Sequence, residues 1–271
     1  MTDAEDTGRA VSRAARIVAM HQPNYIPWAG YFHKLAACDV FVFLDSVQYP
    51  RGQTITNRNL VKTANGVTYL TIPVTLPTAV EGKASYREAE YADRRWKRKH
   101  LRTLEHAYRR ASHFEEIFAL IAGQVEPERR FVDLTIGLID AIASYLEIET
   151  PRHRLSELVL EPRHKNELIV DVCEALGATV YLSGTFARVY NDEDELARHG
   201  IELRYDEYTT PSYPQLWGSF EPNLSVIDML FNCGPESRLL VKEPRSSRKM
   251  PPCPPPGRRT DETGKTAEDH R

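Results

Sequence analysis

Polar and aromatic residues are concentrated in "HQPNYIPWAGYF" (21–32), directly after the short apolar run "RIVAM" (16–20). Pro23 and Pro27 lack an N–H donor and disfavour the helical conformation of the residue before each of them. We therefore predict a shaped loop where a buried strand ends. A histidine there can shuttle protons, and amides and an indole can hold polar groups. The candidates are His21 as a catalytic residue and Gln22, Asn24 and Trp28 as substrate-binding residues. The alternative is that His21 caps the strand and the aromatic residues fill the core.

A second polar group follows the apolar run "VFVFL" (40–44). Because the carboxyl ends of parallel strands meet at one edge of a sheet, we expect Asp45 to lie near His21 and to orient its imidazole. The alternative is that Asp45 caps a turn. The basic side chains of the next segment suit phosphate or carboxylate recognition, although exposed basic loops are also common. The substrate-binding candidates from this stretch are Gln48, Asn57, Arg58, Asn59 and Lys62.

Two later segments complete the set of candidates. In "YLSGTFARVYND" (181–192) an apolar run leads into Ser-Gly-Thr, which can present hydroxyl and N–H groups to a phosphate. The spacing is not that of a P-loop, of G-x-G-x-x-G or of G-x-S-x-G. The aromatic, Pro- and Gly-containing segment 211–236 fits a lid or pocket wall, and equally a structural corner. The substrate-binding candidates here are Ser183, Gly184, Thr185, Tyr190, Tyr213 and Gln215.

Composition limits the classes of function. The chain has 271 residues, 41% of them hydrophobic, and a net charge of -3, which does not favour nucleic-acid binding. Lys and Arg in 94–110 are mixed with Glu105, as on a solvated helix face. Nine histidines and four cysteines show neither H-E-x-x-H nor C-x-x-C spacing, so we expect no metal site and no disulfide framework. The longest apolar run is far below the roughly 20 residues of a membrane span, and a cytoplasmic location is expected.

The pattern of short apolar runs and periodic segments predicts the elements that position these residues. Strands are expected at 16–20, 39–45, 66–74, 179–184 and 200–208, and helices at 29–38, 166–178 and 223–236, with a helical block over 93–176. This order predicts an α/β domain over 16–241, with a mostly parallel, Rossmann-like sheet. The tails at 1–15 and 242–271 have few apolar residues to offset their ordering entropy and are expected to be disordered.

Several long motifs resemble the WbqC-like protein family. They are "HQPNYIPWAGYFHKLAACDVFVFLDSVQY", "NRNLVKT", "YLTIPV", "WKRKHLRTLEHAY", "GATVYLSG" and "YPQLWGSFEPNLSVIDMLFNCGPE", and the similarity runs from about Ile17 to Glu236. The resemblance implies a place in O-antigen, surface-glycan or natural-product biosynthesis. More remotely, a strand followed by a histidine-bearing loop and a helix is similar to pantothenate synthetase and the nucleotidyltransferase superfamily. The paired histidines of those enzymes are absent, because His21 stands alone.

The resemblance and the candidate residues together favour a transferase or amide-forming ligase. It would transfer or activate an acyl or nucleotidyl group in amino-sugar, surface-glycan or secondary-metabolite assembly, with a small-molecule or carrier-bound substrate. The cofactor stays open, with ATP or another nucleotide as the candidate. The alternative hypothesis is a non-catalytic binding or scaffolding protein that holds a nucleotide-sugar or carrier-bound intermediate.

Overall fold

The computed structural model describes residues 15–50, 54–77, 84–161, 163 and 165–242. The two tails predicted to be disordered fall almost entirely outside these residues. The chain forms two compact units. The first, which we call the sheet unit, takes its described residues from 1–21, 34–44 and 150–207. The second, which we call the helical unit, takes them from 22–33, 45–149 and 208–271.

The sheet unit contains a five-stranded parallel sheet with strand order β7-β2-β1-β8-β9. These strands are β1 (Ile17–His21), β2 (Val40–Phe43), β7 (Arg152–Arg154), β8 (Val180–Gly184) and β9 (Glu202–Asp206). Strands β1, β2 and β8 are nearly continuous apolar runs and are mostly buried, as is typical of strands covered on both faces. The prediction of an α/β fold with a mostly parallel sheet is therefore confirmed.

Local sequence signals set the ends of the helices in the sheet unit. Helix α5 (Lys165–Ala175) is followed by Gly177, whose φ of 63° lies in the left-handed region that glycine adopts without strain. The Gly177 N–H donates to Glu174 O at 3.0 Å, and the Ala178 N–H donates to Cys173 O at 2.7 Å. Helix α6 (Glu193–Arg198) is capped at its N-terminus by Asp192, whose side chain accepts from the Glu195 N–H. Helix α1 (Ala29–Ala36) contributes residues to both units.

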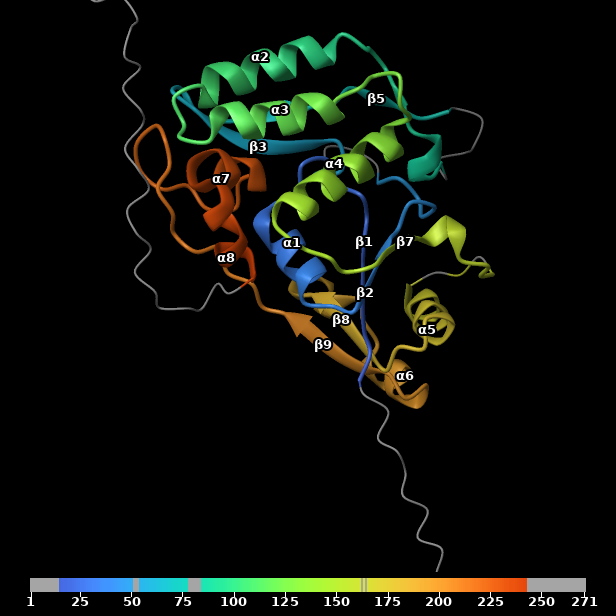
Figure 1. Ribbon diagram of the computed structural model, residues 1–271. Helices are drawn as coiled ribbons and strands as arrows, with labels where there is room; N and C mark the ends of the chain where they lie inside the picture. The colour runs from blue at the N-terminus through green and yellow to red at the C-terminus, as the bar shows by residue number, and fades with distance from the viewer. Residues whose placement is uncertain (1–14, 51–53, 78–83, 162, 164, 243–271) are drawn as a thin grey trace, which may run out of the picture. The chain divides into compact units, whose positions relative to one another are not determined.

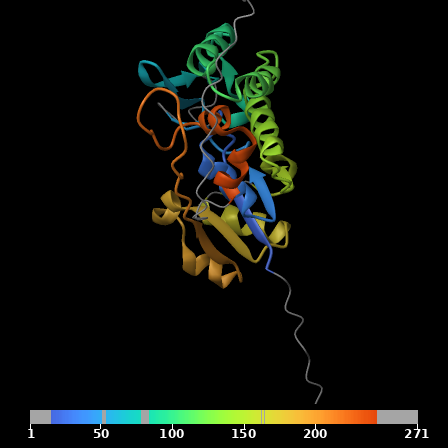
Figure 2. The same ribbon diagram turned by 60° about the vertical axis from the view of Figure 1, so that its left-hand side comes forward.

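The helical unit contains α2 (Trp96–Tyr108), α3 (Phe114–Gln124), α4 (Phe131–Tyr145), α7 (Val226–Cys233) and α8 (Ser237–Lys242). Helix α3 packs beside both α2 and α4 (Figure 1 and Figure 2). Helix α4 is the most apolar of these, and its Leu134, Leu138 and Ile142 are fully buried. Among the described residues, no helix combines the length and the apolar character needed to span a membrane.

Two short antiparallel pairs complete the helical unit, namely β3 (Arg58–Thr63) with β4 (Gly66–Thr71) and β5 (Val74–Thr75) with β6 (Glu90–Tyr91). The sequence identified 57–62 only as a polar segment, because Arg58 and Lys62 mask its alternation. The turn predicted at "ANG" is present, and Gly66 there has a φ of 99°. The helical block expected over 93–176 also contains β7, a strand of the parallel sheet.

Candidate functional site at the carboxyl edge of the sheet

The carboxyl ends of four strands lie in one row of the sheet unit. His21 pairs with Phe43 of β2, and Gly184 of β8 pairs with Asp206 of β9. Ala19 pairs with Leu182, so the same register two residues further on places His21 beside Gly184. In open parallel sheets, ligands bind outside this edge. His21 and the Ser-Gly turn, which are far apart in the sequence, thus reach the same edge of one sheet.

A buried ammonium group lies at this edge. Lys34 of α1 is only 5% exposed, and its Nζ donates to Met20 O at 3.0 Å. Burial lowers the pKa of Lys34 from 10.5 to about 8, while the nearby Asp206 carboxylate acts in the opposite direction. At pH 7 the group is therefore still mainly protonated. A lysine with a perturbed pKa at a ligand-binding edge is a candidate functional residue.

The sequence reasoning missed Lys34. In "AGYFHKLAAC" it is one charged residue of a short helix, and lysines of amphipathic helices usually face water. The signal was its position between Phe32 and Leu35, both of which are fully buried. No local rule shows that Lys34 shares their surroundings, because the covering residues come from other elements.

At the turn after β8, a buried polar side chain is followed by several exposed apolar side chains. Ser183 is buried, and its Oγ accepts from Asn191 Nδ2 at 3.0 Å. The short helix Thr185–Val189 follows, and Thr185 at its start is exposed. Three apolar side chains of this turn are largely exposed: Phe186 at 93%, Val189 at 79% and Tyr190 at 74%. An exposed apolar group of this kind is a common mark of a ligand or partner surface.

The opening loop, 22–28, belongs to the helical unit and is fixed there by its backbone. The Ile26 carbonyl accepts from Asn59 Nδ2 at 2.8 Å and from Ser225 Oγ at 2.7 Å. The Tyr25 N–H donates to Thr56 O at 2.8 Å. Ile26 has a φ of 36°, which is rare for a β-branched residue and costs free energy. The two buried hydrogen bonds to its carbonyl help to hold this strained conformation.

A buried histidine supports the same loop. The His100 Nε2 donates to Thr71 O at 2.9 Å, because a carbonyl can only accept. The Nδ1 of the neutral ring then accepts from the Tyr25 hydroxyl at 2.9 Å. His100 is 2% exposed, and burial lowers its pKa from 6.5 to about 4. It is therefore a neutral structural residue at pH 7.

His100 is expected to make the protein less stable in acid. Its pKa is lower in the folded state than in the unfolded state, so its contribution is complete above pH 6.5 and is lost as the pH falls towards 4. The shift corresponds to about 3 kcal/mol of unfolding free energy. Urea unfolding of wild type and His100→Asn between pH 7 and 4 measures this slope. An equal pH dependence in the two proteins would contradict it.

The helical unit contains a polar cluster that joins three of the predicted substrate-binding residues, Lys62, Tyr213 and Gln215. The Lys62 Nζ donates to Gln215 Oε1 at 3.0 Å and also to the Ser219 carbonyl. The Tyr213 hydroxyl donates to Asp228 Oδ2 at 2.9 Å. All of these bonds connect β3 or α7 to the segment 213–219. They hold the predicted lid or wall in place from within.

Asp228 is the centre of this cluster and was missed from the sequence. It is 1% exposed and accepts hydrogen bonds from the hydroxyls of Tyr108, at 2.8 Å, and Tyr213. Burial raises the pKa of Asp228, and the two hydroxyls and the Lys62 charge act in the opposite direction. In the sequence it is one acid within the helical pattern "SVIDML" and gives no separate signal.

The other predicted site residues of the helical unit differ in burial and in their hydrogen-bond partners. Asp45 and Asn24 are buried, and Gln48 is exposed. The Asn57 Nδ2 donates to Ile72 O at 2.8 Å, and the Arg58 guanidinium lies 4.1 Å from the centre of the Tyr69 ring. The backbone carbonyl of Gln22 accepts a hydrogen bond from the Tyr31 hydroxyl at 3.2 Å. That Asp45 approaches His21 remains a prediction.

Trp28 packs against the start of α1. A Cβ added to Gly30 would lie 2.8 Å from Trp28 Nε1, closer than such atoms approach in proteins. The glycine therefore allows the indole to cover the first turn of the helix. The Trp28 ring also meets Tyr31 edge to face, with 6.1 Å between their centres.

Two other kinds of site would need groups of metal ligands or reactive thiols in the described part of the chain. It contains no group of three or more His, Cys, Asp or Glu side chains that could hold a metal ion. Cys38, Cys173 and Cys233 are buried. Burial raises the pKa of both Cys38 and Cys173 to about 12, so neither is a ready thiolate nucleophile.

The fold and this edge define a class of α/β protein with a parallel sheet, and comparison with known proteins gives the family. The chain belongs to the WbqC-like protein family, which it matches over residues 22–239. It is similar to the uncharacterized protein Rv1507c of Mycobacterium tuberculosis, with 38% identity over 226 residues, covering 81% of this chain and 95% of the relative. No solved structure matches the chain.

Proposed function

We propose that this protein is a group-transfer enzyme, a transferase or amide-forming ligase. It transfers or activates an acyl or nucleotidyl group in amino-sugar, surface-glycan or secondary-metabolite assembly. The observation that supports this most is the carboxyl edge of the sheet, where His21, Gly184 and Asp206 share one row and the buried Lys34 adds a positive charge. Charge of this kind lowers the barrier when negative charge develops during transfer.

The proposed roles follow from the chemistry of acyl transfer to an amine. His21 accepts the proton of the attacking amine and returns it to the leaving group as the tetrahedral intermediate collapses. The Lys34 ammonium stabilises the developing oxyanion through the field it creates at the edge, and Asp206 favours its protonated form. Ser183, Gly184 and Thr185 hold the phosphate or carboxylate of the donor. Tyr190, which is 74% exposed, packs against its apolar part.

A non-catalytic binding or scaffolding protein is the second candidate. One observation favours it: two of the proposed catalytic-edge groups already form hydrogen bonds within the protein. The Lys34 Nζ donates to Met20 O, and the Ser183 Oγ accepts from Asn191 Nδ2. Thermal-shift measurements with ATP, nucleotide sugars and acyl thioesters separate the two functions when mass spectrometry of the products follows. Turnover supports the enzyme, and stabilisation without any product across these donors favours binding alone.

The proposed role of His21 makes a direct prediction. His21→Ala should lower turnover by about 10²–10⁴-fold, the usual contribution of a general acid–base group. Its melting temperature should change little, because the His21 side chain is only partly buried at the end of its strand. His199→Ala is the matched control, since His199 is exposed and pairs with Glu174 in the same unit. Wild-type turnover in His21→Ala would remove His21 from the mechanism.

A further inference from the structure

Positive charge is concentrated on one helix of a chain whose net charge is negative. The segment 94–110 contains eight Lys or Arg residues and one Glu, and most of it forms α2. The net charge of the whole chain is -3, so the other residues are acidic on balance. Within the described residues, Arg94, Lys97, Arg98 and Arg102 form no ion pair with a carboxylate. The charge of this helix is therefore available to a partner.

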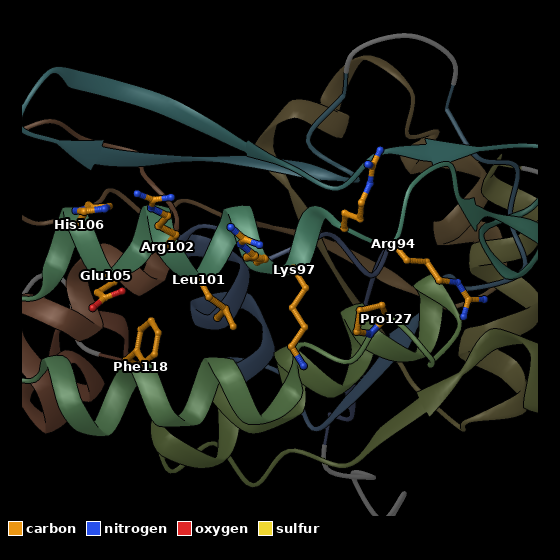
Figure 3. A pocket seen from close by; sticks show the side chains of 10 residues that line it. Arg94, Lys97, Leu101, Arg102, Glu105, His106, Phe118 and Pro127 are labelled. Atoms are coloured by element: carbon orange, nitrogen blue, oxygen red, sulfur yellow. The ribbon is translucent and has the colours of Figure 1, made fainter.

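A groove of about 670 Å³ lies along α2 and is lined partly by apolar side chains. Leu101 and Phe118 point into the space between α2 and α3, and Lys97 reaches across it (Figure 3). Pro127 lies towards one end, near Arg94. The groove thus combines an apolar floor with a cationic rim, both within the helical unit.

This combination selects among anionic partners. A nucleic-acid duplex or a polyphosphate presents repeated charge on its outside and no aliphatic face that could pack on Leu101 and Phe118. Helix α2 also borders a second hollow, whose lining includes Tyr69, Leu70, Trp96, Arg98 and Thr103. That hollow has apolar side chains of its own, but a larger share of its lining is polar than in the first groove. An occupant of the first groove needs apolar and acidic groups at regular spacing.

We propose that the groove between α2 and α3 binds an acidic amphipathic helix of a partner protein. Apolar side chains spaced along one face of that helix would pack on Leu101 and Phe118. Carboxylates flanking this face would pair with Arg94, Lys97 and Arg98 on the rim. The charge asymmetry would also steer the partner towards α2 and raise its association rate at low salt.

Fluorescence anisotropy with the full chain tests this proposal. The probe is a labelled peptide of about 18 residues, designed as a helix with leucines on one face and glutamates elsewhere. A scrambled peptide of the same composition is the second probe. The ordered peptide should bind about tenfold more tightly than the scrambled one, and Arg94→Glu with Arg98→Glu should weaken its binding by about tenfold or more. Leu101→Asp should have a similar effect.

The matched control is Arg109→Glu with Arg110→Glu, which makes the same change of charge on exposed residues that do not line the groove. This variant should bind the ordered peptide nearly as wild type does. The proposal is overturned if both peptides bind equally, if the control weakens binding as much as the groove variant, or if Leu101→Asp has no effect. It is also overturned if an oligodeoxynucleotide of about 20 nucleotides binds more tightly than the peptide.

Discussion

Replacing Lys34 with methionine is expected to lower turnover by about 100-fold or more and, at pH 7, to make the protein more stable. Burial lowers the pKa of Lys34 from 10.5 to about 8, which corresponds to about 3 kcal/mol of unfavourable free energy for the charged form. Methionine fills similar space without that charge, although the Met20 carbonyl loses its hydrogen-bond donor. A net gain of about 2 kcal/mol is expected. Urea unfolding and product formation measure the two effects.

The pH dependence gives an independent test of Lys34. The native state releases this proton near pH 8, whereas the unfolded chain keeps it until about 10.5, so this group makes the free energy of unfolding rise between these values. Turnover that needs the ammonium should instead fall above pH 8. Lys34→Met should lose both features, and Lys99→Met, at an exposed site on α2, should keep them. Wild-type turnover in Lys34→Met would exclude the electrostatic role.

The largest loss of stability is expected from Asp228→Ala, at about 3–5 kcal/mol of unfolding free energy. The substitution leaves the hydroxyls of Tyr108 and Tyr213 without their acceptor, and it removes a carboxylate that interacts with the charge of the buried Lys62. Each orphaned polar group adds its own desolvation cost. Asp228→Asn should cost less, because its side-chain oxygen can still accept one of the two hydroxyl bonds.

Chemical denaturation of four proteins tests the expected loss of stability. Wild type, Asp228→Ala and Asp228→Asn are compared, with Asp194→Ala as the control at an exposed carboxylate in the first turn of α6. The control should change stability by no more than about 1 kcal/mol. A loss below about 1 kcal/mol in Asp228→Ala would show that the cluster contributes little to folding.

Features that depend on neighbouring residues in the chain could be predicted from the sequence. The apolar runs at 16–20 and 39–45 became β1 and β2, because a strand buried on both faces needs apolar residues throughout. Pro23 and Pro27 excluded regular structure from the opening loop, and Gly177 marked the end of α5. Each of these signals acts through backbone geometry or local periodicity.

The role of each polar side chain was decided by tertiary structure. Lys62 meets Gln215 across 153 positions of the sequence, and Ser225 holds Ile26 across 199. Lys34 and Asp228 look like ordinary helix residues until the elements that bury them are in place. The sequence alone determined the parallel α/β architecture and the residue types at the ends of its strands. Only the tertiary structure decided which charges are buried, because desolvation depends on every group packed around a side chain and not on its neighbours in the chain.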